Sequence, residues 1–102
     1  MAIDFLGIAS QVQQSAPKGY ADLQDQLKRA AISIPLNIGE ASGKTSKPDT
    51  RRFYAIARGS VMECGAILDV FSKLEIIEKA RAAEGKLLLE RIAAMLTKLT
   101  RI

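Results

Sequence analysis

The 102-residue sequence contains no histidine and no tryptophan, and its only cysteine is Cys64. Without imidazole the chain cannot form the Ser-His and Cys-His pairs of many hydrolases, and it lacks the side chain that most zinc sites use. A single cysteine allows no disulfide within the chain, which is typical of a protein from a reducing cytoplasm. We therefore expect a cytoplasmic protein that is not an enzyme and that binds no metal and no cofactor.

Long apolar runs are also absent. No hydrophobic segment approaches the roughly 18–20 residues that span a bilayer, so we expect no contact with a membrane. The first ten residues contain Asp4 and no basic residue, which argues against a signal peptide. A hydrophobic content of 48% with 25% charged residues is typical of a folded globular chain, and the length fits one domain over residues 1–102.

Apolar residues recur at helical spacing in four segments, and no segment shows the sustained alternation of a strand. Short connections between long helices favour antiparallel neighbours, so the sequence predicts an all-α chain folded as an up-down-up-down four-helix bundle. The boundary between the last two helices is poorly marked, because neither glycine nor proline occurs there. The predicted helices cover residues 3–15, 20–42, 47–73 and 79–101.

The helix ends and the buried faces follow from the same pattern. Ser46 with Asp49 resembles a capping box at the start of the third predicted helix, and Gly43 is placed for a left-handed cap after the second. Each helix should turn one apolar stripe towards the core. The stripes are Phe5, Ile8, Ala9 and Val12, then Leu23, Leu27, Ala30, Ala31, Ile34, Ile38 and Ala41, then Phe53, Ile56, Ala57, Ser60, Cys64, Ile67, Leu68 and Phe71, and finally Leu88, Ile92, Met95, Leu96 and Leu99.

The second and third predicted helices each carry a further face of apolar or small residues, away from the core-facing stripe. A bundle of four helices needs only one buried stripe from each helix. A second stripe on two helices therefore predicts burial against another copy of the chain, in a homo-oligomer. The residues expected at this contact are Ile32, Leu36, Ala55, Gly59, Met62 and Ala66.

A proline and several polar residues interrupt the apolar middle of the second predicted helix. Pro35 costs about 3 kcal/mol in a helix interior and frees the carbonyl of Ala31. Asn37 could donate to freed carbonyls or join a buried polar network. Arg29 and Glu40 share a flank, which leaves two interpretations open. Glu40 pairs with Arg29 or with a neighbouring chain, or it is solvated on a kinked helix.

Two ionisable side chains lie at the apolar stripe of the third predicted helix. Cys64 is on the stripe, and we expect a small buried hydrophobic residue rather than a nucleophile. Glu63 is at its margin, and we expect partial burial in a structural ion pair rather than a catalytic acid, because no second polar group converges nearby. Arg58 is the nearest basic residue in sequence, although a partner from another helix or chain suits helical geometry better.

The net charge of +4 is concentrated in residues 44–59, where Asp49 is the only acidic residue. Cations in the first turns of a helix oppose its macrodipole, so a sequence with no use for them more often places Asp or Glu there. Cations beside exposed helix N–H groups suit phosphate. Two interpretations stay open, which are backbone binding to RNA or DNA with little sequence preference, and a solvated basic face. The basic residues of this window are Lys44, Lys47, Arg51, Arg52 and Arg58.

Two motifs resemble a known bacterial family. The first is QLKRAAISIPLNI, residues 26–38, followed by a short segment of small residues and Glu40. The second comprises Phe53-Tyr54, Ala57-Arg58-Gly59-Ser60 and Glu63-Cys64. Together they are similar to the four-helix-bundle proteins encoded in intervening sequences of some 23S rRNA genes. The resemblance is specific over about residues 23–71, and it implies a four-helix bundle that assembles as a homopentamer.

Relatives of that family include the accessory variability protein of diversity-generating retroelements, a pentameric barrel that works with a reverse transcriptase on nucleic acid. The sequence thus leads to two hypotheses of different classes. The first is a non-enzymatic oligomeric bundle that binds RNA or DNA backbone as an accessory to a nucleic-acid-processing enzyme. The second is a protein-interaction scaffold that binds no nucleic acid, with a protein partner that the sequence does not identify.

Overall fold

The structure is a computed structural model that describes residues 1–15 and 19–101, apart from the side chains of residues 12–15. Those residues form four helices and no strand, which confirms the all-α prediction. Every helix boundary lies within one residue of its predicted position. The helices are α1 (Ala2–Ser15), α2 (Ala21–Ser42), α3 (Lys47–Lys73) and α4 (Lys79–Thr100).

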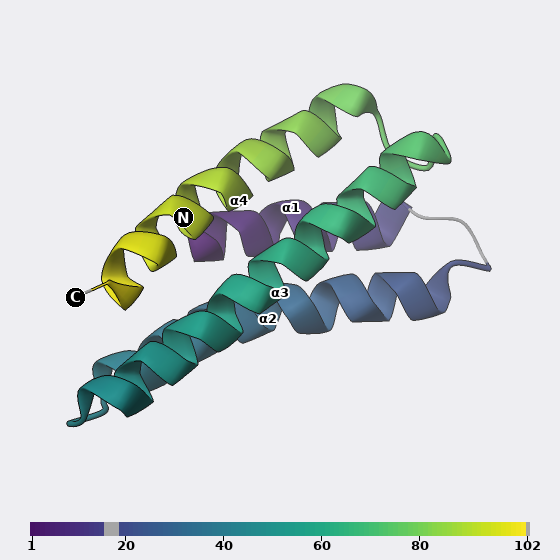
Figure 1. The fold of residues 1–102 in the computed structure, drawn as a ribbon. Coiled ribbons are helices and arrows are strands. Elements are labelled where there is room, and N and C mark those ends of the chain that lie inside the picture. Colours follow the sequence, from purple (N-terminus) through teal and green to yellow (C-terminus); the bar gives the residue numbers. More distant parts are fainter. Residues whose placement is uncertain (16–18, 102) are drawn as a thin grey trace.

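The helices pack side by side in an elongated bundle with extents of 44 × 21 × 17 Å (Figure 1). Each helix packs against the next one in the chain, and α4 also packs against α1. In the view of Figure 1, α3 crosses in front of α1 and α2, and both chain ends lie on the left. No helix among the described residues is both long and apolar enough to cross a membrane.

One apolar core runs between the four helices, built mainly from the predicted stripes. One prediction within it was wrong. Ile56 is 43% exposed while Val61 is buried, because Ala57 and Val61 fill the inner face of α3 and Ile56 lies about 100° around the helix from Ala57. On α4, Leu89 is buried although it was not on the predicted stripe, and Leu88 is half-buried and packs against the core. The side chain of Val12, expected on the buried face of α1, lies outside the described residues. The largest fully buried side chains are Phe5, Phe71, Leu27, Ile34, Leu68, Ile92, Leu96 and Cys64.

The connection between α2 and α3 is a tight turn. The Ser46 side chain accepts a hydrogen bond from the backbone N–H of Asp49 at 3.3 Å, so Ser46 caps α3 as predicted. The left-handed cap expected at Gly43 was wrong, because this residue has a φ of −90°. The N–H groups of Gly43 and Lys44 donate to the carbonyls of Glu40 and Ala41, which continues the last turn of α2 without a left-handed residue.

Helix α3 ends at Lys73, and two residues later Glu75 has a left-handed backbone with a φ of 59°. The N–H of Glu75 donates to the Ser72 carbonyl at 3.1 Å and that of Ile76 to the Phe71 carbonyl at 2.9 Å, which is the Schellman pattern. A glycine normally occupies this position, because a side chain is strained there. Because a glutamate occupies the position where a glycine is usual, the sequence contains no clear signal for this boundary.

Helices α3 and α4 approach each other closely where Gly85 lies on α4. A Cβ atom at Gly85 would lie 2.9 Å from Leu68 Cδ1 and 3.5 Å from both Ile8 Cγ2 and Phe5 Cε1. Lys86 and Asp69 form an ion pair of 2.7 Å beside this contact. The absence of a side chain at Gly85 therefore allows α4 to pack against α1 and α3 together.

Candidate nucleic-acid interface

The basic window identified in the sequence falls on the exposed half of α3 and the turn before it. We define the first half of α3 as residues 47–60 and the second half as residues 61–73. The first half buries only Ala57, and the second half supplies the rest of the buried face. Its buried residues are Val61, Cys64, Ile67, Leu68 and Phe71. The cations of the first half therefore occupy a surface that the core does not need.

Two of the five cations are held by partners within the chain. Lys44 Nζ lies 5.0 Å and Arg52 Cζ lies 4.7 Å from the centroid of the Phe53 ring. Lys44 Nζ is also 3.5 Å from Glu40 Oε2, and Arg52 Nε is 4.0 Å from Asp49 Oδ1. The ring and the two carboxylates attract these cations. Lys44 and Arg52 therefore help to stabilise the turn between α2 and α3.

The other three cations, Lys47, Arg51 and Arg58, form no ion pair with any described residue. Positions four and seven residues apart fall within about 40° of one another around a helix, and eleven residues span about 16 Å. We call these three residues the basic stripe. Like charges at such spacings repel one another, so the isolated chain gains no stability from the stripe, and a bound anion would relieve the repulsion.

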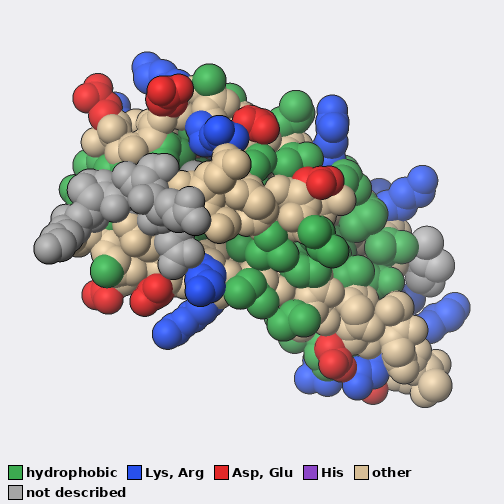
Figure 2. All heavy atoms as spheres, turned by 180° about the vertical axis from the view of Figure 1, so that it is seen from behind, with side chains coloured by type: hydrophobic (Ala, Val, Ile, Leu, Met, Phe, Trp, Pro, Cys, Tyr) green, Lys and Arg blue, Asp and Glu red, His purple; other side chains and the backbone are tan. Residues whose placement is uncertain are grey.

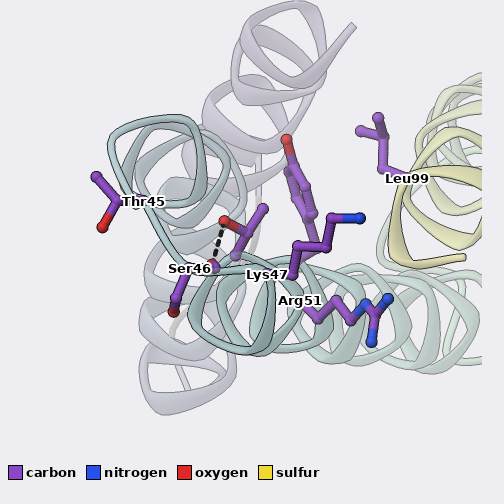
Figure 3. A pocket seen from close by; sticks show the side chains of 7 residues that line it. Thr45, Ser46, Lys47, Arg51 and Leu99 are labelled. Atoms are coloured by element: carbon purple, nitrogen blue, oxygen red, sulfur yellow. Dashed lines mark hydrogen bonds between the residues drawn. The ribbon is translucent and has the colours of Figure 1, made fainter. Parts of the chain in front are cut away.

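A groove of about 230 Å³ lies beside the start of the basic stripe, where the end of α4 meets α3. Lys47 and Arg51 extend from α3 with their nitrogen atoms on the side nearer to α4, and Leu99 projects from α4 (Figure 3). Inside the groove, Thr50 Oγ1 donates to the Ser46 carbonyl at 2.9 Å (Figure 3, dashed line). The lining residues are Thr45, Ser46, Lys47, Thr50, Arg51, Tyr54 and Leu99.

The sequence pattern gave no sign that Tyr54 and Leu99 belong to a site. Leu99 fell on the predicted core stripe of its helix, and in the structure it is only half-buried. Tyr54 is also half-buried and packs against the edge of the core. No local signal could have paired them, because their proximity depends on how far α4 extends along α3.

A second groove, of about 440 Å³, lies further along α3. The sequence assigned two different roles to the residues of this groove. Arg51 and Arg58 were expected to bind nucleic acid, whereas Ala55, Gly59 and Met62 were expected at an oligomer contact. The lining residues are Arg51, Ala55, Arg58, Gly59, Met62 and Thr100. The two expected surfaces therefore overlap on one face of α3.

The residues expected at the oligomer contact are all exposed in the single chain. Leu36 on α2 is 63% exposed and Met62 on α3 is 55% exposed, which are high values for large apolar side chains. A Cβ atom at Gly59 would meet nothing within 4 Å. Hydrophobic side chains gather over the middle of the face opposite to that of Figure 1 (Figure 2). The remaining members of the set are Ile32, Ala55 and Ala66.

A polar network joins α2 to α3 near Pro35. Asn37 Nδ2 donates to the carbonyl and to the Oγ of Ser33, both at 2.8 Å, and Ser60 Oγ donates to Ser33 Oγ at 2.8 Å. The expected bond from Asn37 to the carbonyl that Pro35 frees does not form. Because Asn37 lies one turn after Ser33, its amide reaches the Ser33 carbonyl first. The network explains a polar group in this part-buried position.

The charged residues near this network are exposed in the single chain, which agrees with the interpretation of Glu40 as a solvated side chain. Glu40 is exposed and pairs with Lys44, whereas Arg29 makes no ion pair with a described residue. Glu63 is exposed and forms no ion pair in the described part of the single chain, so its burial against a partner from another chain stays a prediction. Cys64 is fully buried, and its burial, followed by the charge of Glu63, raises the pKa of the thiol to about 12.

The described residues contain no cluster of acidic or cysteine side chains able to hold a metal ion. No curated protein matches the chain significantly. A family model described as 23S rRNA-intervening sequence protein matches residues 2–98, which is nearly the whole chain and includes every helix core. The match confirms the resemblance carried by the two sequence motifs. The chain belongs to the 23S rRNA-intervening sequence protein family.

Proposed function

We propose that the protein is a non-enzymatic, oligomeric helical bundle that binds the phosphate backbone of RNA or DNA through the first half of α3. The observation that carries this proposal is the basic stripe, three cations that form no ion pair with a described residue, on the half of the helix that the core does not use. A cation that contacts a phosphate releases condensed counterions, and this release supplies affinity that does not depend on sequence.

The contrast among the five cations supports binding over a merely solvated face. Lys44 and Arg52 have an aromatic ring and carboxylates beside them, so the chain does provide partners for cations in this region. The basic stripe is left without them, and Lys47 lies in the first turn of α3, where the macrodipole disfavours a cation. An external anion would offset both costs.

We also infer that the helices run up-down-up-down and that the chain assembles with copies of itself, as a pentamer by family resemblance. Packing between consecutive helices and between α1 and α4 supports this topology. The exposed apolar and small residues on α2 and α3 support assembly, because water contact with such faces is unfavourable. Light scattering that showed only an 11.1 kDa monomer at micromolar concentration would exclude it.

The surfaces proposed for assembly and for nucleic-acid binding overlap in the middle of α3. The residues of the basic stripe should therefore differ in their roles. Arg58 lines the second groove with Gly59 and Met62, so a copy packed on that face would cover its surroundings. Lys47 lies closer to the start of the helix and outside that groove, whereas Arg51 lines both grooves. We expect Arg58→Glu to weaken assembly, and Lys47→Glu to leave the oligomer size unchanged.

Binding is tested with two charge reversals that remove the same charge. One variant carries Lys47→Glu and Arg51→Glu, and the other carries Lys79→Glu and Arg91→Glu on α4, where both residues are exposed and form no ion pair in the described part of the chain. Fluorescence anisotropy with a labelled RNA hairpin and a labelled DNA duplex at low salt measures affinity. We expect the α3 variant to lose at least tenfold more affinity than the α4 variant. Equal losses would mean that net charge alone attracts the polyanion.

The exposed apolar faces also suit a second function, a protein-interaction scaffold that binds no nucleic acid. The same binding experiment separates the two functions. A wild-type oligomer that binds neither the hairpin nor the duplex at low salt would favour the scaffold. Binding that depends on Lys47 and Arg51 would favour an accessory role beside a nucleic-acid-processing enzyme.

A further inference from the structure

The groove at the start of α3 combines two kinds of side chain that a phosphate site alone would not need. Lys47 and Arg51 supply positive charge without an acidic partner in the described residues. Tyr54 and Leu99 supply an aromatic ring and an aliphatic side chain on the same groove. Cations beside an apolar and aromatic surface suit a ligand that is itself an anion joined to a flat apolar ring.

We propose that this groove holds one unpaired base of an RNA or DNA strand against Tyr54 and Leu99, while Lys47 and Arg51 bind the adjoining phosphates. The proposal rests on the backbone binding described above and adds the kind of strand that is bound. Every base has a π face that an aromatic ring can stack on, so such a contact favours unpaired strands without reading a particular sequence.

The shape of the groove favours an unpaired base over a duplex. With a volume of about 230 Å³ between the start of α3 and the end of α4, it has room for a planar group but not for a double helix. In a duplex, the faces of the bases are covered by their neighbours, and only a splayed or single-stranded base can enter such a groove. The duplex would contact the basic stripe through its phosphates alone.

Two of the hydroxyl groups in the groove form local hydrogen bonds. Ser46 Oγ accepts from the Asp49 N–H, and Thr50 Oγ1 donates to the Ser46 carbonyl. The hydroxyls of Thr45 and Tyr54 form no hydrogen bond with a described residue, so they can bond the edge of a base whose face lies against Tyr54 and Leu99. The groove contains none of the residues expected at the oligomer contact, although Arg51 also lines the second groove, which does contain them.

The chain offers a direct spectroscopic test, because it has two tyrosines and no tryptophan. The other tyrosine, Tyr20, lies at the opposite end of α2 from the turn that leads into α3. In a Tyr20→Phe variant, tyrosine fluorescence reports on Tyr54 alone. The probes are a short oligothymidine strand, an abasic strand of the same length and charge, a DNA duplex, and thymidine monophosphate.

We expect the oligothymidine to quench Tyr54 and to bind about tenfold more tightly than the abasic strand, as one base–aromatic stack would give. Tyr54→Leu, which keeps an apolar side chain, should abolish that preference, and Tyr54→Phe should retain it. Tyr20→Leu serves as the matched control.

If oligothymidine and the abasic strand bind equally, the base contact is overturned while backbone binding stands. If neither binds, both are overturned. If the mononucleotide binds as tightly as the strand, the occupant is a free nucleotide and the proposal is wrong.

Discussion

The two halves of α3 share one helix and differ in almost everything else. The first half buries only Ala57 and carries four cations, whereas the second half places five side chains in the core and is followed closely by a strained residue. The second half is thus committed to holding the bundle together. The first half is stabilised by the Ser46 cap and by Lys44 and Arg52, which stack on Phe53. The basic stripe makes no comparable contact with the described residues.

From this division we expect substitutions in the two halves to have different effects on stability and on binding. Changes in the second half should lower the free energy of unfolding and affect binding only through loss of fold. Changes in the basic stripe should alter binding and leave unfolding almost unchanged. Each experiment below sets one half against the other or tests a single feature of one half.

The largest effect is expected at Leu68, which is fully buried in the second half. Leu68→Ala should lower the free energy of unfolding by about 2–5 kcal/mol, because it removes apolar contacts and leaves a cavity. Ile56→Ala is the control, since Ile56 is 43% exposed and lies in the first half. Urea denaturation at protein concentrations that favour the monomer measures both. A comparable loss in the two variants would contradict the division.

A glycine pair gives the next largest contrast. Gly85→Val should cost about 1–3 kcal/mol, because its Cβ would press against Leu68 in the second half. Gly59→Val should not destabilise the monomer, because nothing lies within 4 Å and valine has a better helix propensity than glycine. Gly59→Leu should instead reduce oligomer size if another copy packs there. Thermal denaturation and light scattering test the two sides of this contrast.

Glu75 allows a stabilising change just after the second half. Glu75→Gly should raise the free energy of unfolding by about 0.5–1 kcal/mol, because glycine adopts the left-handed backbone without steric strain. The same substitution at Glu78, whose φ is −67°, should bring no gain. A Glu75→Gly variant that melts at or below the wild-type temperature would show that the side chain has a compensating contact.

The smallest effect at neutral pH concerns Cys64. Burial raises the pKa of its thiol from 9.0 to about 12, so folding favours the protonated form. Its contribution to stability is therefore complete below pH 9 and is lost as the pH rises from 9 towards 12. Cys64→Ala should remove this part of the alkaline loss of stability. Rapid alkylation of the native wild-type thiol at pH 8 would contradict its burial.

The sequence predicted the helices well because helical periodicity and capping are local properties. Ser46 marked the start of α3 in the sequence, and the residues predicted on the second apolar faces of α2 and α3 are exposed in the single chain. The errors arose where local patterns do not determine the outcome. Glu75 adopts a backbone that favours glycine, and Val61 replaces Ile56 on the inner face because neighbouring helices decide which edge of a stripe is covered.

The candidate site was predicted only in part, for a related reason. The sequence identified the five cations but could not separate the pair stacked on Phe53 from the basic stripe, since that separation depends on how the turn after α2 folds back. The groove formed with Leu99 depends on contacts between residues about fifty positions apart. Such contacts follow from helix lengths and packing, which periodicity alone does not supply.

The most direct test of the account compares two neighbouring arginines with the same charge. Arg51 belongs to the basic stripe, and Arg52 stacks on Phe53 beside Asp49. The salt dependence of binding to a labelled RNA hairpin is measured for the wild type, Arg51→Gln and Arg52→Gln. The account predicts that Arg51→Gln reduces the slope of log affinity against log salt by about 0.9, while Arg52→Gln leaves it nearly unchanged. Equal changes in slope for the two variants would contradict the assignment of phosphate binding to the basic stripe.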